Sequence, residues 1–379
     1  MLSGIRARLL VTFLLASVLP LTLGGMVFYA LVNQTITSET FQKVGFARNA
    51  KSGEITQYLT HARKQAEDLA KSSNVRYSVG QFYGFSYAIR QLAETPREGG
   101  ALLRDIFGVS HSNPESLGVG TNDRLLREAL EYANIYRRFH AGFLSFLQDS
   151  PFDNLYLVDR YGQIVYAAHA DAYLGRHLEG AAAGIESAHT ALRDQDGPTP
   201  IVQDFARDAV TGKFSAYLAV PVVLHSHTRG ALILRMPPTG IQSLLEGSET
   251  PLTVLSAQGA VIAASDPTAV TSIGKSAPLP VEMATPSSVA ILDTGLSGSP
   301  ALTAWGRLSP PNPPWLVVAE ASSDQAFFNS RRLGIALLVI GAGTVVVLAT
   351  LVFLFSKSLT RPIQRLAEAA SAVAEGSLN

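Results

Sequence analysis

Two long runs without a charged residue constrain this chain more than any other feature. The first covers residues 9–32 and the second residues 333–355, so they are 24 and 23 residues long. At about 1.5 Å per residue, a helix of either length spans roughly 35 Å, enough to cross a hydrocarbon core about 30 Å thick. We therefore predict a transmembrane helix at each run.

The charges beside the two runs predict their orientation. Basic residues precede the first run and follow the second: Arg6, Arg8, Lys357, Arg361 and Arg365. Cytoplasmic flanks of membrane helices are enriched in Lys and Arg, so we expect residues 1–8 and 356–379 in the cytoplasm and residues 33–330 outside the membrane. A cleaved signal peptide is the alternative for the first run, but its apolar region is about 7–15 residues, shorter than this run.

Charge and cysteine content exclude several classes of protein. The chain has 30 Lys+Arg and 30 Asp+Glu, a balance that offers no basic face to nucleic-acid phosphates. Residues 33–332 hold 25 basic and 28 acidic residues, so the outer segment is mildly acidic. An apolar fraction of 47% argues against a disordered chain. The absence of cysteine excludes disulfides and thiolate sites and suits a domain outside the cytoplasm.

Helical periodicity marks two long segments of the outer region. Between residues 39 and 71 apolar positions recur every three or four residues, which predicts an amphipathic stalk helix continuous with the first span. A second helix is predicted over residues 122–148. Its aromatic stripe has helical spacing and is expected to lie in a core: Tyr132, Tyr136, Phe139, Phe143 and Leu147.

The pattern then changes to strands and repeats once. Residues 155–159 and 163–168 are rich in apolar and β-branched residues around Gly162, which predicts a hairpin whose glycine adopts positive φ. The same apolar pattern returns 97 residues later around Gly259. Strand pairs follow each hairpin, at residues 214–223 and 230–236 and then at 301–308 and 315–320. We predict an α+β fold with two tandem antiparallel-sheet modules, residues 33–240 and 241–330.

The order of these elements resembles the double Cache (dCache) family of bacterial transmembrane receptors, over residues 33–330. The stretch VDRYGQIVYAA resembles the central hairpin of that family's PAS-like sheets, and DAVTGKFSAYLAVPV followed by GALILRM resembles its next strand pair. The stretch PPWLVVAEASSDQAF resembles its last strand and exit helix. The resemblance implies a sensor domain in the periplasm or outside the cell, with a small-molecule pocket in the membrane-distal module.

The segment after the second run resembles the first half of a HAMP linker, the four-helix relay beneath many bacterial receptors. Thr360 is expected to cap a helix with Pro362 in its first turn, and Glu375 and Gly376 to end it. The resemblance implies signal relay through Pro362, Glu375 and Gly376, and a homodimer, because a HAMP bundle needs two chains. It also implies that a second HAMP helix and an output domain would follow Asn379 in a complete receptor.

Sequence signatures of catalysis and metal binding are missing. The chain contains no GxSxG, HExxH, Walker lysine loop or GxGxxG motif after a strand. His225 and His227 alternate, but two histidines without a third ligand favour a solvated loop over a zinc site. We therefore expect no catalytic residues, no metal and no cofactor, and no enzymatic activity in this part of the chain.

The resemblance also suggests where a ligand would bind. Amino-acid-binding members of the family carry a tyrosine and an aspartate where this chain has Ala206 and Arg235. An arginine facing the pocket favours carboxylate or phosphate, so we predict a small anionic ligand over an amino acid. The alternative is that Arg235 extends toward solvent at the sheet edge. The candidate ligand-binding residues, each of which could instead be core or loop, are Tyr166, His169, Asp204, Phe205, Tyr217 and Arg235.

The leading hypothesis is a ligand-sensing, signal-transducing receptor of the bacterial inner membrane. Ligand binding would shift the second span, and the HAMP helix would convert that shift into a change of dimer packing. Two alternatives stay open. The chain could be the sensor half of a histidine kinase or nucleotide cyclase whose catalytic domain lies beyond it, or an ectodomain that binds protein rather than a small ligand.

Overall fold

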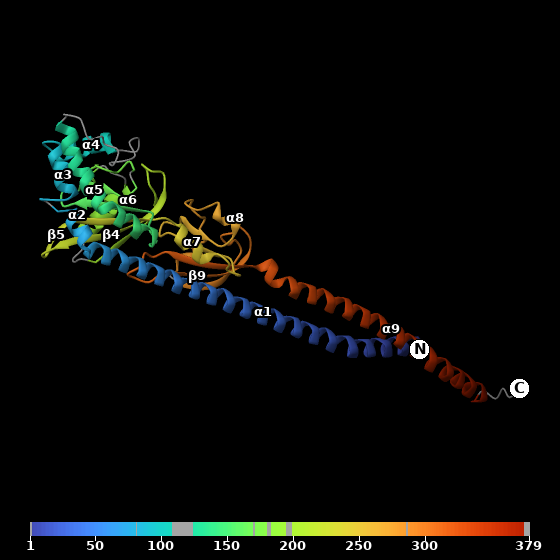
Figure 1. Ribbon diagram of the computed structural model, residues 1–379. Coiled ribbons are helices and arrows are strands. Elements are labelled where there is room, and N and C mark those ends of the chain that lie inside the picture. The colour runs from blue at the N-terminus through green and yellow to red at the C-terminus, as the bar shows by residue number, and fades with distance from the viewer. Residues whose placement is uncertain are drawn as a thin grey trace. The chain divides into compact units, whose positions relative to one another are not determined.

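The computed structural model describes residues 2–80, 82–107, 124–169, 171–179, 183–194, 199–285 and 287–374. The chain divides into two compact units (Figure 1). One contains the residues up to Lys43 together with those from Ala321 onward, and the other is Val44–Glu320.

The first unit is built from parts of two long helices. Helix α1, Leu2–Lys71, contains the whole first uncharged run, and helix α9, Ser323–Ala374, contains the second. Among the described residues one segment, Ala326–Leu351, is long and apolar enough to cross a membrane. That segment agrees with the predicted second span, whereas the span at residues 9–32 stays a prediction.

The predicted start of a separate helix at Thr360 is wrong. Helix α9 begins at Ser323 and continues through Pro362 without a break. The apolar run and the segment after it share one helical period, so no cap is needed between them. Glu375 and Gly376, the predicted end of the relay helix, lie outside the described residues.

The second unit begins with the amphipathic part of α1. Val44, Ile55, Leu59, Ala62 and Ala66 are all buried, and their spacing places them on one face of the helix. The predicted stalk helix is therefore present, and one face of it packs in the core. In the described residues before the first sheet, α1 is followed by α2 Ser73–Ser78, α3 Phe85–Leu92, α4 Pro96–Phe107 and α5 Arg124–Gln148.

The first sheet follows α5 and has the strand order β2-β1-β5-β4-β3. Its neighbouring strands pair antiparallel. Helix α6, Ala183–Asp194, contacts β3, β4 and β5, whereas α3 contacts β2 and α5 contacts β1. The strands are β1 Asn154–Asp159, β2 Ile164–Ala167, β3 Ile201–Arg207, β4 Phe214–Leu224 and β5 His227–Met236.

The second sheet repeats this plan with the order β7-β6-β10-β9-β8. The turn glycines of the two hairpins, Gly162 and Gly259, have φ of 82° and 83°, as predicted from their shared pattern. Two antiparallel-sheet modules in an α+β fold are thus confirmed. The strands are β6 Leu252–Leu255, β7 Val261–Ala264, β8 Ser287–Leu292, β9 Ala301–Arg307 and β10 Leu316–Ser322; short helices α7 Thr239–Leu245, α8 Pro267–Val270 and η2 Val281–Ala284 connect them.

Candidate functional site

Polar side chains gather on the face of the first sheet that α6 covers. On β1, Asn154 and Tyr156 are two residues apart and so share this face. Arg235 on β5 pairs with Asn154 on one side and with Tyr217 on β4 on the other. All four are buried. Because buried polar groups are costly unless paired, such a group of side chains marks a candidate functional site.

Arg235 is held by acidic and phenolic groups of its own chain. Its Nε donates to Asp153 Oδ1 at 2.6 Å, and its Nη1 donates to the Tyr156 hydroxyl at 3.1 Å. The Asp171 carboxylate lies 3.5 Å from Nη1. Burial lowers the pKa of Arg235, but Tyr156, Asp153 and Asp171 outweigh that effect and raise it overall. The guanidinium therefore stays charged and is already paired.

Asp171 ties the segment after β2 to the sheet. The Tyr156 hydroxyl donates a short hydrogen bond to Asp171 Oδ2, and Asn154 Nδ2 donates to the same oxygen at 3.2 Å. The other oxygen accepts the Tyr173 N–H at 3.0 Å. Burial raises the pKa of the Asp171 carboxyl, and the negative charge of Asp208 raises it further against the lowering effect of these bonds.

Asp208 is the second carboxylate of the site and follows β3. The Tyr173 hydroxyl donates to both of its oxygens, at 2.5 and 2.6 Å, and the Tyr217 hydroxyl donates at 2.8 Å. Backbone N–H groups of Val210 and Thr211 complete the set. Burial raises the pKa of Asp208, but these hydrogen bonds outweigh it and leave the pKa below its ordinary value. Asp208 is thus a charged, buried carboxylate, and in the part of the chain that the structure describes it hydrogen-bonds to no cationic group.

The site carries more negative than positive charge. We call it the polar cluster, and its members are Asp153, Asn154, Tyr156, Asp171, Tyr173, Asp208, Tyr217 and Arg235. The cluster holds three carboxylates and one guanidinium, and Asp153 and Asp171 pair with that guanidinium. Burial and Asp208 raise the pKa of the Tyr173 hydroxyl, and Arg176, a second cation nearby, opposes that rise. Even with Arg176 counted, carboxylates outnumber cations. The physical basis for an anionic ligand, an unpaired Arg235, is therefore not present.

The six candidate ligand residues predicted from sequence do not come together. Tyr217 and Arg235 belong to the polar cluster, but Tyr166 lies on the opposite face, because it pairs with Leu157 while Tyr156 pairs with Ala167. There Tyr166 stacks on Phe85 and hydrogen-bonds His140 of α5 at 2.7 Å. The buried aromatic stripe of α5 packs on this face, as predicted.

The remaining three candidates contact other parts of the unit. The side chain of His169 is exposed, and only its backbone reaches the cluster, through Asn154. Asp204 accepts a hydrogen bond from the Trp315 indole at 2.6 Å, and the Phe205 ring packs on Trp315 with centroids 5.3 Å apart. Trp315 precedes the last strand of the second sheet, so Asp204 and Phe205 join the two sheets.

Most of the cluster was not predicted from the sequence. The missed members are Asp153, Asn154, Tyr156, Asp171, Tyr173 and Asp208. Asn154 and Tyr156 gave one detectable signal, because they are polar positions two residues apart in an otherwise apolar strand. Asp208 gave another, since an aspartate followed by Thr-Gly three residues later is typical of a turn closed by its side chain.

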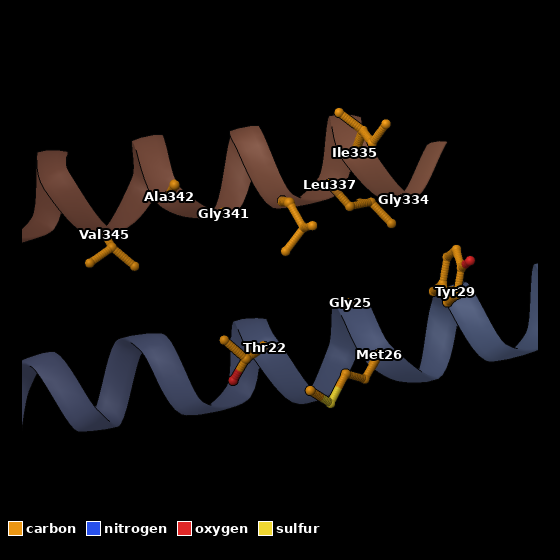
Figure 2. A pocket seen from close by; sticks show the side chains of 11 residues that line it. Thr22, Gly25, Met26, Tyr29, Gly334, Ile335, Leu337, Gly341, Ala342 and Val345 are labelled. Atoms are coloured by element: carbon orange, nitrogen blue, oxygen red, sulfur yellow. The ribbon is translucent and has the colours of Figure 1, made fainter. Parts of the chain in front are cut away.

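Neither the histidines nor the groove in the first unit forms a polar site. His225 and Ser226, with φ of 47° and 61°, make the turn between β4 and β5. The described residues contain no group of three His, Asp or Glu placed to hold a metal. A groove of about 690 Å³ runs between α1 and α9 (Figure 2). It is lined by small and apolar residues such as Gly25, Met26 and Gly341, which suit hydrocarbon rather than a polar ligand.

Comparison with known proteins adds structural neighbours only. No protein-family model and no curated protein sequence matches the chain. Similar solved structures include the ligand-binding domain of the Pseudomonas fluorescens chemoreceptor CtaA in complex with L-isoleucine, at 12% identity and a TM-score of 0.43, covering 78% of this chain and 97% of that one. The sensory domain of the Campylobacter jejuni chemoreceptor Tlp3 is 11% identical with a TM-score of 0.47, covering 77% and 97%. The sensor domain of the V. cholerae histidine kinase DctB is 11% identical with a TM-score of 0.44, covering 75% and 99%.

Proposed function

We propose that this chain is a membrane-anchored sensor that binds a small molecule at the polar cluster of its first sheet. The observation that carries the proposal is the cluster itself: one buried and two half-buried carboxylates, a buried guanidinium and three tyrosine hydroxyls on one face of the sheet beneath α6. Apolar residues at these positions would make a fold of this size more stable. The presence of polar residues there therefore favours a role in recognition.

The charge balance of the cluster favours a ligand that carries an ammonium group. Asp171 and Asp208 are close enough for the charge of one to raise the pKa of the other. The rings of Tyr156 and Tyr173 pack edge to face between them, with centroids 6.0 Å apart. Carboxylates and tyrosine faces together attract organic cations, and a bound ammonium would relieve the repulsion between the two aspartates.

The signal would leave the sensor through α9. This proposal is supported by the unbroken helix from Ser323 to Ala374, which contains the candidate span and Pro362. We propose that residues 9–32 form a second span, that both termini are cytoplasmic in a bacterial inner membrane, and that residues 356–379 act as the first part of a HAMP-like relay in a homodimer. In this proposal the chain itself makes and breaks no covalent bond, and a kinase, cyclase or chemotaxis output would follow Asn379.

A thermal-shift panel on the full chain in detergent micelles tests the ligand class. Butylamine and butyrate have the same carbon chain and opposite charge, and L-isoleucine carries both groups. We expect butylamine and L-isoleucine at saturating concentration to raise the melting temperature by about 5 °C, because a ligand that binds only the folded state stabilises it. Butyrate is expected to leave it unchanged.

Two variants assign any shift to the cluster. Asp208→Asn removes a buried charge and is expected to abolish the response to butylamine. Asp149→Asn changes an exposed aspartate at the end of α5 and is expected to preserve it. Stabilisation by butyrate alone would favour the anionic ligand predicted from the sequence and would overturn the proposed ammonium ligand. No stabilisation by any of the three compounds would count against a small-ligand sensor.

A protein-binding ectodomain is the second candidate function, and one surface favours it. Tyr77, Phe82 and Tyr83, around the connection between α2 and α3, have 52%, 78% and 45% of their surface exposed. Exposed aromatic residues are enriched in protein interfaces. The absence of any thermal shift in the ligand panel would favour a protein-binding ectodomain.

A further inference from the structure

The third strand of the first sheet is irregular at one point. The pairing of β3 with β4 is regular up to Gln203 and resumes at Ala206, so Asp204 and Phe205 lie at the irregularity. A bulge of this kind turns side chains away from the regular alternation and is often found at functional positions. Here it turns both side chains toward the second sheet.

Asp204 binds two separate segments of the second module. Its Oδ1 accepts the indole N–H of Trp315 at 2.6 Å, and its Oδ2 accepts the backbone N–H of Ala257 at 2.8 Å. Trp315 is fully buried, and its indole N–H is a donor only, so without Asp204 a buried donor would lose its partner. Phe205 packs its ring between those of Phe214 and Trp315.

The same strand is connected to the polar cluster. Gln203 pairs with Tyr217, whose hydroxyl donates to Asp208, and Asp208 directly follows the end of β3 at Arg207. A rearrangement of Tyr217 or Asp208 therefore changes the strand from which Asp204 and Phe205 project.

Trp315 connects its contact with Asp204 and Phe205 to β10, the last strand of the second module. It directly precedes β10, which lies in the centre of the second sheet between β6 and β9. Its carbonyl accepts the Leu308 N–H at 2.9 Å. Strand β10 ends at Ser322 and α9 begins at Ser323, so the chain continues from Trp315 to the candidate membrane span without a loop.

We propose that Asp204, Phe205 and Trp315 form a coupling joint that transmits changes in the polar cluster to β10 and thereby to α9. The proposal rests on the proposed sensor function for its biological meaning, but the coupling itself exists without a ligand. Packed elements joined by a buried hydrogen bond and stacked rings transmit displacement because they resist continuous deformation.

Hydrogen–deuterium exchange of the full chain in detergent micelles tests the coupling without a ligand. Tyr217→Phe removes one hydrogen bond inside the cluster and serves as the perturbation. In the otherwise native chain we expect it to speed amide exchange about fivefold in β3 and also in residues 316–319 of β10. In a Trp315→Phe background, which removes the indole donor, the effect is expected to persist in β3 and to vanish in β10.

Trp305→Phe is the matched control. The Trp305 indole donates to Thr285 inside the second module, so this variant loses a comparable hydrogen bond without touching the joint. We expect Tyr217→Phe to act on β10 in that background as in the native chain. If Trp315→Phe does not fold, Asp204→Ala, which removes the acceptor of the indole N–H, replaces it with the same expectation.

Two results would overturn the joint: no change in β10 when Tyr217→Phe is made in the native chain, or an unchanged effect on β10 when Trp315 or Asp204 is replaced. Neither result affects the outcome of the ligand panel. The coupling joint and the proposed ligand class can therefore be rejected independently.

Discussion

Arg235 lies at the centre of the polar cluster, and its surroundings decide what the site attracts. The sequence placed this arginine on a strand of the first sheet and predicted an attraction for anions. Two aspartates bind it: Asp153 precedes β1, and Asp171 follows β2 at the other end of the same hairpin. Only folding brings these two residues close to β5. Residue identity predicted the charge correctly, whereas the partners depend on tertiary contacts that periodicity does not encode.

Glu320 is a half-buried carboxyl of the second module whose pKa the fold displaces. Its Oε1 accepts the Leu296 N–H at 2.8 Å and lies 3.4 Å from the Thr303 hydroxyl. Burial raises the pKa of Glu320 above its ordinary value despite these bonds. The folded state then binds a proton before the unfolded state does, so the free energy of unfolding should rise as pH falls from 7 through the raised pKa toward 4.5.

Glu320→Gln tests this sign. The amide resembles the protonated carboxyl, so we expect the variant to be at least as stable as the native chain at pH 7 and to show a smaller increase on acidification. Denaturant unfolding at pH 7, 6 and 5 measures it. Glu282→Gln, at an exposed position, should keep the native pH slope. An unchanged slope in Glu320→Gln would contradict the assignment.

At the scale of elements, the two hairpins and the repeated sheet were predictable, whereas the edge strands β3 and β8 were not. The turn glycines and the apolar alternation identified β1, β2, β6 and β7. Strands β3 and β8 were missed, because an edge strand is half exposed and most of its residues lack the apolar pattern that marks a central strand. The bulge at Asp204, which turns that residue to the second sheet, was invisible for the same reason.

The sequence also did not predict on which face of the first sheet each candidate residue lies. Tyr166 and Tyr217 both look like pocket residues in the sequence, yet they face opposite sides of one sheet. Which side holds the ligand site depends on what covers it: α5 brings aromatic rings to Tyr166, whereas α6 and the segment at Asp171 cover Tyr217.

Helix α6 rests on the cluster through a glycine. A Cβ added at Gly184 would lie 2.4 Å from Cε2 of Tyr217, whose hydroxyl is fixed by Asp208. We expect Gly184→Ala to destabilise the chain by about 1–3 kcal/mol through overpacking and to abolish the thermal response to butylamine. Denaturant unfolding and the ligand panel measure the two effects.

Gly53→Ala is the control for helix propensity. Gly53 lies in α1 with nothing within 4 Å of an added Cβ, so alanine should stabilise by about 0.5–1 kcal/mol. If Gly184→Ala were equally stabilising and still responded to butylamine, α6 would not pack on the cluster as described.

At the scale of the whole molecule, the chain combines an α+β unit with a unit made of two long helices. Helix α1 belongs to both units and α9 begins where the second sheet ends, so each end of the α+β unit continues directly into a helix of the other. The sequence predicted this division from its two uncharged runs. It predicted neither the polar cluster nor the joint, since both depend on contacts between residues far apart in the chain.

A crystal structure of the chain with butylamine bound tests the central claim most directly. The account predicts density for the ligand on the α6-covered face of the first sheet, with its nitrogen about 3 Å from a carboxylate oxygen of Asp171 or Asp208. Ligand density on the opposite face, beside Tyr166 and His140, would contradict it, as would an empty α6 face in crystals grown at a saturating concentration.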